Sequence, residues 1–267
     1  MTMAMPVKEL EHRCKEAQDI VREAGALARA AFLDRESLSI STKGTQDWAT
    51  NADLEVEELI RMRLAKSFPD EAILGEEQGH SGSVVHQDTW VIDPIDGTTC
   101  FLLGLPQWCV VLTYVINGKP VVATIYHAMQ DEMFSATLGG GTRVNGLPVR
   151  VSDSTSVTEG LIAVGAAQVA DPEKSAQFIA ELVGSGGMFV RVGACALALC
   201  YVASGRLLAA YEPWVCPWDD LAGMLLVQEA GGLTNPYSKT IGVDKRRPVL
   251  AACPGIWSTV EPLLRSA

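Results

Sequence analysis

The sequence is short of positive charge. Its 267 residues include 21 Lys and Arg against 32 Asp and Glu, which gives a formal net charge of −11. The only basic run is Lys245-Arg246-Arg247. Proteins that bind nucleic acids or anionic membranes usually present a basic face, so we expect neither kind of partner. An acidic protein with an anionic ligand needs local positive charge, and a bound divalent cation is the simplest source of it.

Motifs built on histidine, cysteine or serine are also missing. The four histidines lack H-E-x-x-H spacing, and the seven cysteines contain no C-x-x-C pair. A thiolate zinc site or a disulfide framework therefore fits poorly, and most of the cysteines are expected to be buried thiols in a reducing cytoplasm. The absence of G-x-S-x-G, P-loop and dinucleotide-binding glycine motifs disfavours serine hydrolases, P-loop enzymes and dinucleotide oxidoreductases.

No segment predicts export or membrane insertion. Residues 1–10 lack the apolar stretch of a secretory signal. Residues 98–118 carry no charge over 21 positions, but Gly104, Pro106 and Gln107 interrupt them. The remainder is rich in β-branched and aromatic residues, so we expect a buried strand there.

The rest of the chain is typical of a globular protein, with 48% apolar residues. Apolar side chains at helical spacing predict a long helix over residues 10–31, and a second helix over 54–66 is expected to be capped by Asn51 or Asp53. Asn-Gly pairs at 117–118 and 145–146 predict hairpin turns.

Hairpins dominate up to residue 151, and strands alternate with helices from residue 152. This change predicts an α/β (α+β) fold, a layered αβαβα sandwich with two β-sheets. No Pro- or Ser-rich linker separates the halves, so we expect a single domain with lobes at 1–151 and 152–267.

Carboxylates gather at the ends of the expected elements. The densest run, Asp93-Pro94-Ile95-Asp96-Gly97-Thr98, directly follows the apolar strand 90–92. Its two aspartates can converge on one point, with Pro94 stiffening the turn between them. Gly97 allows close approach of the backbone to a ligand, and Thr98 can cap a following helix whose N–H groups face an anion. A simple Asx-rich turn is the alternative, but the surrounding residues favour a metal and phosphate site.

Three further clusters are ambiguous when taken singly. Gly75-Glu76-Glu77 follows a short apolar strand, while Trp218-Asp219-Asp220 and the segment 47–53 open expected helices. Taken alone, the Glu pair is more typical of solvated surface, and helix capping is a sufficient explanation for each of the other two.

Together these clusters resemble a known family. The chain contains, in order, K-x-x-x-D-x-x-T-x-x-D, G-E-E, W-x-x-D-P-I-D-G-T, Trp218-Asp219-Asp220-Leu221-Ala222-Gly223 and E-A-G-G. Their order and spacing resemble the inositol monophosphatase family of magnesium-dependent, lithium-sensitive phosphomonoesterases. The resemblance spans about residues 40–235.

The resemblance implies a catalytic site with two or three Mg²⁺ ions. Its ligands would be the backbone carbonyl of Ile95 and the side chains of Glu76, Asp93, Asp96 and Asp219. Oxygen ligands of this kind are what Mg²⁺ prefers. The backbone of Gly97 and Thr98 would hold the phosphate. Thr98, paired with Asp53, would orient and deprotonate the attacking water together with Glu76, so that hydrolysis is direct and forms no phosphoenzyme.

The substrate contacts are less complete. Glu212 matches the family position that holds a substrate hydroxyl, and Lys43 matches a mobile lysine near the metals; a solvated surface charge is the alternative for both. Gly193-Ala194-Cys195 stands where the family usually has Gly-Thr-Ala, so Ala194 cannot offer a hydroxyl. Cys100 replaces a common Asn and cannot supply the two donors of that amide.

The expected function is therefore a Mg²⁺-dependent phosphomonoesterase of small polyol or sugar monophosphates, with inositol-1-phosphate as the type substrate. The resemblance also implies a homodimer. Histidinol phosphate is the next candidate substrate, and 3′-phosphoadenosine 5′-phosphate follows because 99–101 lacks the Lys-Glu-Phe of that branch. A non-catalytic metal- or anion-binding regulatory protein is the remaining alternative.

Overall fold

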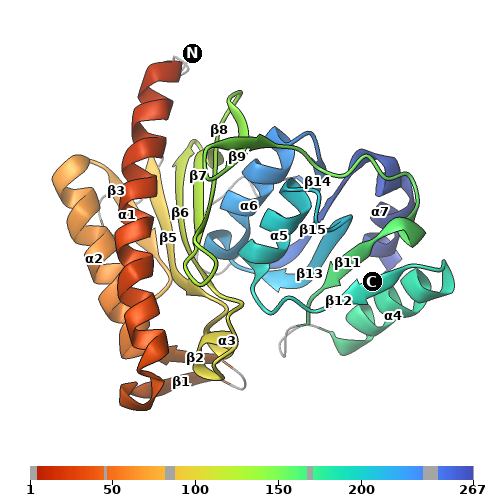
Figure 1. The fold of residues 1–267 in the computed structure, drawn as a ribbon, viewed down its shortest axis with the longest axis horizontal. Helices are drawn as coiled ribbons and strands as arrows, with labels where there is room; N and C mark the ends of the chain where they lie inside the picture. Colours follow the sequence, from red (N-terminus) through yellow and green to blue (C-terminus); the bar gives the residue numbers. More distant parts are fainter. Residues whose placement is uncertain (1–4, 45–46, 82–87, 167–170, 237–245, 267) are drawn as a thin grey trace.

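The expected αβαβα layering is present in the computed structural model, which describes residues 5–44, 47–81, 88–166, 171–236 and 246–266 (Figure 1). The α-helices are α1 (Val7–Leu33), α2 (Asn51–Ser67), α3 (Thr98–Leu102), α4 (Pro172–Gly184), α5 (Cys195–Ala203), α6 (Pro217–Glu229) and α7 (Trp257–Ser266). Short 3₁₀ turns lie at Arg35–Ser37, Val157–Glu159 and Pro254–Ile256.

The larger sheet is built mainly from hairpins and has the order β10-β9-β8-β7-β6-β5-β3-β4. Its strands are β3 (Ala72–Gly75), β4 (Gly79–Ser81), β5 (Thr89–Asp96), β6 (Cys109–Ile116), β7 (Lys119–His127), β8 (Glu132–Thr137), β9 (Gly141–Val144) and β10 (Leu147–Val149). Both predicted Asn-Gly turns are confirmed, because all four residues have positive φ and each pair joins antiparallel strands. Among the described strands of this sheet, β3 and β5 are the one parallel pair.

The smaller sheet has the order β12-β11-β13-β15-β14. Its strands are β11 (Leu161–Val164), β12 (Met188–Val190), β13 (Ala209–Val215), β14 (Leu233–Thr234) and β15 (Arg247–Ala252). A separate two-stranded ribbon of β1 (Ile40–Gly44) and β2 (Asp47–Thr50) adds to the two predicted sheets.

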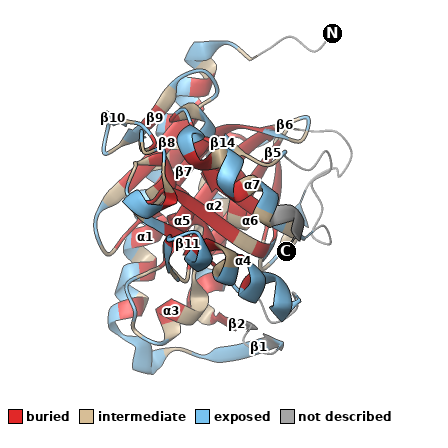
Figure 2. Ribbon diagram, turned by 90° about the vertical axis from the view of Figure 1, so that its right-hand side faces the viewer, coloured by how far each residue is buried: buried red, intermediate tan, exposed pale blue. Residues whose placement is uncertain are grey.

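The helices of the outer and middle layers differ in how much of their surface is buried. Helices α1 and α2 cover one face of the larger sheet, α5 and α6 fill the space between the sheets, and α4 and α7 lie on the far side of the smaller sheet (Figure 1). Helix α1 buries a single stripe that includes Ala17, Ile20, Val21 and Ala24, as an outer helix should. Helix α5 is buried at nearly every residue because it packs between two sheets, and Figure 2 shows this concentration of buried residues.

Three local predictions were wrong. The N-cap of α2 is Thr50 rather than Asn51 or Asp53, since the Thr50 side chain accepts from the Asp53 N–H while the Asp53 carboxylate accepts from the Thr50 N–H. Strand β5 continues to Asp96 instead of turning at Pro94, because pairing with β6 resumes after an irregularity between Asp93 and Asp96.

The third correction concerns Thr98, which is the first residue of α3 and makes no capping bond; Gly97 is the N-cap. The seven cysteines, in contrast, are all free and buried as predicted. Within the described residues, none of the helices combines the length and apolar composition that crossing a bilayer requires.

Candidate active site

The acidic residues meet where β3 and β5 end. These two strands are parallel, with Gly75 opposite Ile92, so their carboxyl ends lie at the same edge of the sheet. Glu76 directly follows β3, and its N–H donates to the carbonyl of Ile92 at 3.2 Å. Asp93 directly follows Ile92 in β5. The parallel pairing therefore places Glu76 and Asp93 side by side.

Helix α6 brings Asp219 to the same edge. Its first turn contributes Cys216, Trp218 and Leu221 to a buried apolar cluster with Leu74 of β3 and Val91 of β5. Asp219 is fixed within that turn because its Oδ2 accepts the N–H of Cys216 at 2.6 Å. This packing explains how an aspartate far along the chain reaches the ends of β3 and β5.

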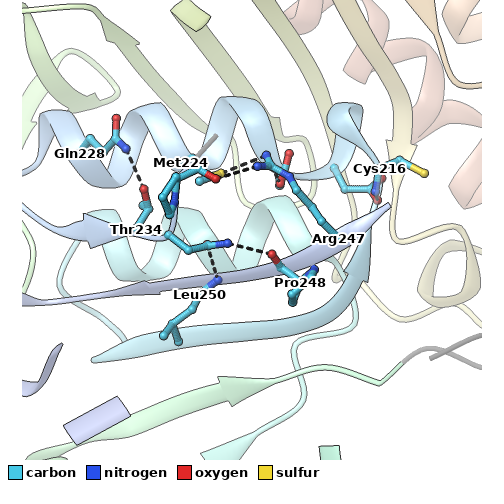
Figure 3. Close-up of polar contacts among 11 residues, drawn as sticks. Cys216, Met224, Gln228, Thr234, Arg247, Pro248 and Leu250 are labelled. Carbon is cyan, nitrogen blue, oxygen red and sulfur yellow. Dashed lines mark hydrogen bonds and ion pairs between the residues drawn. The ribbon is translucent and has the colours of Figure 1, made fainter. Parts of the chain in front are cut away.

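The neighbouring aspartate points elsewhere. Asp220 is fully buried, and its Oδ2 accepts from Nη2 of Arg247 on β15 at 2.7 Å. Figure 3 shows Arg247 beside Met224, whose sulfur it also contacts at 3.5 Å. Burial raises the pKa of Asp220 to about 7, although Arg247 lowers it. The two aspartates thus make different contacts. The Asp220 carboxylate binds Arg247, whereas Asp219 lies beside Glu76 and Asp96.

Several acids lie close enough to Asp93 for their negative charges to act on it. Burial raises the pKa of Asp93 well above its ordinary value, and the negative charges of neighbouring acids raise it further; these acids are Glu76, Asp96, Asp219 and Asp53. The pKa of Asp219 is also raised well above its ordinary value, by burial first and then by Glu76 and Asp96. The structure therefore brings all five predicted acids together.

Asp96 connects the site to α5. Its Oδ1 accepts the N–H of Cys195 at 3.2 Å and its Oδ2 accepts the N–H of Ala196 at 2.7 Å. The formal N-cap of α5, Ala194, has no side chain that can accept, so Asp96 satisfies these amides from another element. Burial raises the pKa of Asp96 to about 6, and the same backbone donors lower it.

Gly97 permits a close approach between two loops. Its φ of +94° is in the left-handed region, and a Cβ at this position would lie 2.7 Å from the carbonyl of Gln107 and 3.0 Å from Cβ of Ala194. Thr98 turns back, and its Oγ1 donates to the carbonyl of Ile95 at 3.1 Å. Gly97, Thr98, Ile95 and Ala194 are consequently neighbours, as the resemblance requires.

The Cys100 side chain packs against the backbone of the turn at Gly193. Its Sγ donates to the carbonyl of Gly193 at 3.7 Å, and a Cβ on Gly193 would lie 2.5 Å from that sulfur. The thiol is a weak donor. Cys100 therefore packs against the turn that contains Ala194, where an Asn would have offered a stronger pair of hydrogen bonds.

Glu212 lies beside the cluster at the middle of β13. Burial raises its pKa to about 8, the charge of Asp96 raises it too, and Arg191 lowers it. Its carboxylate occupies the space next to Gly165, where an added Cβ would overlap both carboxylate oxygens. The carbonyl of Gly165 is itself held by the hydroxyl of Ser175 at 3.2 Å. Gly165 thus sets where the carboxylate of Glu212 can lie.

We expect Gly165→Ala to displace the Glu212 carboxylate, because the side chain can move more easily than the backbone. If Glu212 holds a substrate hydroxyl, the KM for a phosphate ester that carries this hydroxyl should rise, while kcat changes less. Steady-state kinetics of Gly165→Ala and of a control variant test this. Gly184→Ala is a matched control, since a Cβ there meets nothing within 4 Å. Unchanged KM in Gly165→Ala would contradict the assigned contact.

The donor set suits a hard divalent cation. The acids offer only oxygen atoms, and their mutual repulsion favours a positive ion between them. Asp53, Asp93 and Asp96 are buried, whereas Glu76 and Asp219 are half-buried. In the described part of the chain, however, no three His, Cys, Asp or Glu side chains stand in ready ligand geometry. Asp93, Asp96 and Asp219 instead accept backbone N–H groups. Each carboxylate oxygen has a second lone pair, so these bonds leave room for a cation.

One predicted residue cannot be placed. Lys43 belongs to β1, but its side chain lies outside the described residues. Two other residues were missed by sequence reasoning, namely Gly165 and Glu57. Glu57 is fully buried and accepts two backbone N–H groups just after Glu76. Its position one helical turn after Asp53 was the only available signal.

Nearly the whole chain matches a known family. The sequence model of the inositol monophosphatase family aligns with residues 9–262. The chain belongs to this family. The resemblance seen in the motifs is thereby confirmed.

Individual relatives within the inositol monophosphatase family carry different names. The chain is 35% identical to Nus factor SuhB of Escherichia coli K12 over 224 residues, which cover 81% of this chain and 82% of that protein. It is also 35% identical to inositol monophosphatase 2 of Solanum lycopersicum over 240 residues, covering 86% and 90%. The solved structure of an IMPase from Thermotoga maritima has a TM-score of 0.84 at 27% identity, covering 96% of this chain and 97% of that one.

Proposed function

We propose that this protein is a Mg²⁺-dependent phosphomonoesterase that acts on a small polyol or sugar monophosphate. The observation that carries the proposal is the gathering of Glu76, Asp96, Asp219 and Asp53 around the buried carboxylate of Asp93. Membership of the inositol monophosphatase family supports the same chemistry. A set of acids that repel one another in a buried space is costly unless a cation or protons neutralise them.

The residues would share the work of binding and hydrolysis. Mg²⁺, as two or three ions, would be held by the carbonyl of Ile95 and the side chains of Glu76, Asp93, Asp96 and Asp219. When bound, Mg²⁺ polarises phosphoryl oxygens, lowers the pKa of water and stabilises the leaving oxygen. The backbone at Gly97 and Thr98 would orient the phosphate. The left-handed turn at Gly97 supports this role because it leaves no side chain in the way.

The proposed chemical step is a direct in-line displacement. The hydroxyl of Thr98 would orient the attacking water by accepting a hydrogen bond from it, and the carboxylate of Glu76, with Asp53 acting through Thr98, would take up its proton. A bond forms between the water oxygen and phosphorus, the ester P–O bond breaks, and the leaving alkoxide receives a proton. The products are an alcohol and inorganic phosphate. Thr98 Oγ1 donates to the Ile95 carbonyl, so its oxygen still has lone pairs that can accept from water. Its pairing with Asp53 stays a prediction, as does the role of Lys43.

Substrate choice would depend on Glu212 and the turn at Ala194. Burial raises the pKa of the Glu212 carboxyl, and its oxygens can accept a hydrogen bond from a substrate hydroxyl. This supports a polyol or sugar, with inositol-1-phosphate as the type substrate. Histidinol phosphate and then 3′-phosphoadenosine 5′-phosphate are the next candidates. A homodimer and inhibition by lithium also stay predictions.

We expect the purified protein to release phosphate from inositol-1-phosphate in the presence of Mg²⁺ and not in the presence of EDTA. The test is a panel of inositol-1-phosphate, histidinol phosphate and 3′-phosphoadenosine 5′-phosphate, with inorganic phosphate measured over time. Release from one of the other two esters would keep the chemistry and change the substrate. No release from any of them would defeat the proposal in favour of a non-catalytic protein.

A regulatory role is the second candidate. It is favoured by one finding, the 35% identity to a protein named Nus factor SuhB. A regulator does not need an intact hydrolytic site, whereas here every proposed ligand position has its carboxylate. The intact set of acids therefore makes the enzyme the stronger proposal.

A further inference from the structure

A buried ion pair on α2 holds the turn that contains Glu76. The Glu57 carboxylate is fully buried. Its Oε2 accepts the N–H of Glu77 at 2.8 Å, and its Oε1 accepts the N–H of Gln78 at 3.1 Å. The N–H of Glu76 donates to the carbonyl of Ile92, so three consecutive backbone N–H groups of this turn have an acceptor. The backbone on both sides of the Glu76 side chain is thereby fixed.

Arg61 connects the Glu57 carboxylate to the next strand, β4. It donates from Nε to Oε1 of Glu57 at 2.8 Å, from Nη2 to the carbonyl of Gly79 at 2.6 Å and from Nη1 to Oγ of Ser81 at 3.0 Å. The guanidinium thus neutralises the buried carboxylate and ties both ends of β4 to α2. The planar fork of arginine suits such a three-way contact better than a lysine would.

The sequence leaves space for this contact. A Cβ on Gly75 would overlap Oε1 of Glu57 and would lie 2.7 Å from Nη2 of Arg61. Gly75 therefore allows the carboxylate to reach the backbone beyond β3. Asp53 and Glu57 are four residues apart on α2, so they lie on the same side of the helix. One rigid helix accordingly carries Asp53 to the acidic cluster and fixes the turn of Glu76.

We propose that Glu57 is a positioning residue that, with Arg61, holds Glu76 in place for cation binding. This inference rests on the proposed function, in which Glu76 is a Mg²⁺ ligand. Residues that orient metal ligands through hydrogen bonds typically contribute about 10- to 100-fold to metal affinity or activity. A role limited to stability would leave Mg²⁺ affinity unchanged in the folded protein.

The test is Glu57→Gln in the full chain. The amide keeps one oxygen acceptor but turns an NH₂ toward the second backbone N–H, so the turn must shift. We expect Mg²⁺ binding, measured by isothermal titration calorimetry without substrate, to weaken by about 10- to 100-fold. Amide hydrogen exchange of residues 76–78 should become faster. Glu58→Gln is the matched control, because exposed Glu58 contacts the same turn only through the Gln78 side chain.

The outcomes separate this inference from the proposed function. Weakened Mg²⁺ binding in Glu57→Gln supports positioning even if no tested ester is hydrolysed. Wild-type Mg²⁺ affinity together with unchanged exchange would overturn it even if the enzyme is active. If Glu57→Gln does not fold, Arg61→Lys replaces it, and we expect weaker Mg²⁺ binding there as well. Unchanged binding in Arg61→Lys would then overturn the inference.

Discussion

Asp93→Asn is expected to abolish phosphate release while the protein stays folded. Removing a residue that merely orients a ligand costs about 10- to 100-fold, so loss of a proposed direct ligand should exceed about 100-fold. The substitution keeps the shape of the side chain. It removes one of several charges that repel one another in a buried space. The metal-free variant should accordingly be at least as stable as the wild type.

Three measurements on Asp93→Asn test this expectation: phosphate release, Mg²⁺ binding by calorimetry and thermal unfolding in EDTA. Asp70→Asn is the matched control, because Asp70 is an exposed aspartate away from the cluster. It should behave like the wild type in all three. Turnover close to the wild-type rate in Asp93→Asn would sink the proposed site. A large loss of stability in EDTA would show that Asp93 serves the fold instead.

The metal-free protein should lose stability as the pH rises from about 5 to about 8. The folded-state pKa values of Asp93 and Asp219 are well above the ordinary value, that of Asp96 is about 6 and that of Glu212 is about 8. Between the unfolded and folded pKa values, the folded state binds more protons than the unfolded state. The free energy of unfolding therefore falls with rising pH over this window.

Other groups change the size of this effect but not its sign. Asp220 acts in the same direction, with a pKa raised to about 7. His127 acts in the opposite direction, because burial lowers its pKa and the unfolded state binds its proton more tightly. One histidine is outnumbered by the raised carboxyl groups. The net slope should stay negative.

Mg²⁺ should reverse the loss, and more strongly at high pH. A ligand that binds only the folded state stabilises it, and a cation competes with protons for the same carboxylates. Unfolding midpoints at about pH 5.5 and 8.5, with EDTA or with Mg²⁺, measure both effects. Asp93→Asn should show a smaller pH dependence in EDTA than the wild type. A midpoint that is flat or rises with pH in EDTA would contradict the coupling of the acids.

Sequence patterns predicted those helices and turns that are determined by neighbouring residues in the chain. The apolar stripe of α1 and the Asn-Gly turns depend on residues close together in the chain, and both were found as expected. The N-cap of α2 was missed because Thr50, Asn51 and Asp53 are all good capping residues, and only three-dimensional geometry selects Thr50. The extension of β5 beyond Pro94 depends on its pairing with β6, which the local sequence does not encode.

The candidate site was predictable to a similar extent. The acids follow strands or open helices, so their types and spacing gave the cluster through the family resemblance. The groups that surround them could not be found in this way. Gly165 and Glu212 are distant in sequence, as are Glu57 and the turn after Glu76, and their contacts arise only from packing. The resemblance did select Asp219 over Asp220, but the contact of Asp220 with Arg247 is another that arises only from packing.

Asp96 makes the architecture and the proposed metal site mutually dependent. It belongs to a strand of one sheet, while the amides that it holds begin a helix packed against the other sheet. Sliding of one sheet past the other would pull these amides from the carboxylate and misalign the acids beside it. Close packing of the middle layer is therefore required to keep the proposed metal ligands aligned. A substitution in that layer, remote from any substrate atom, should weaken cation binding before it unfolds the protein.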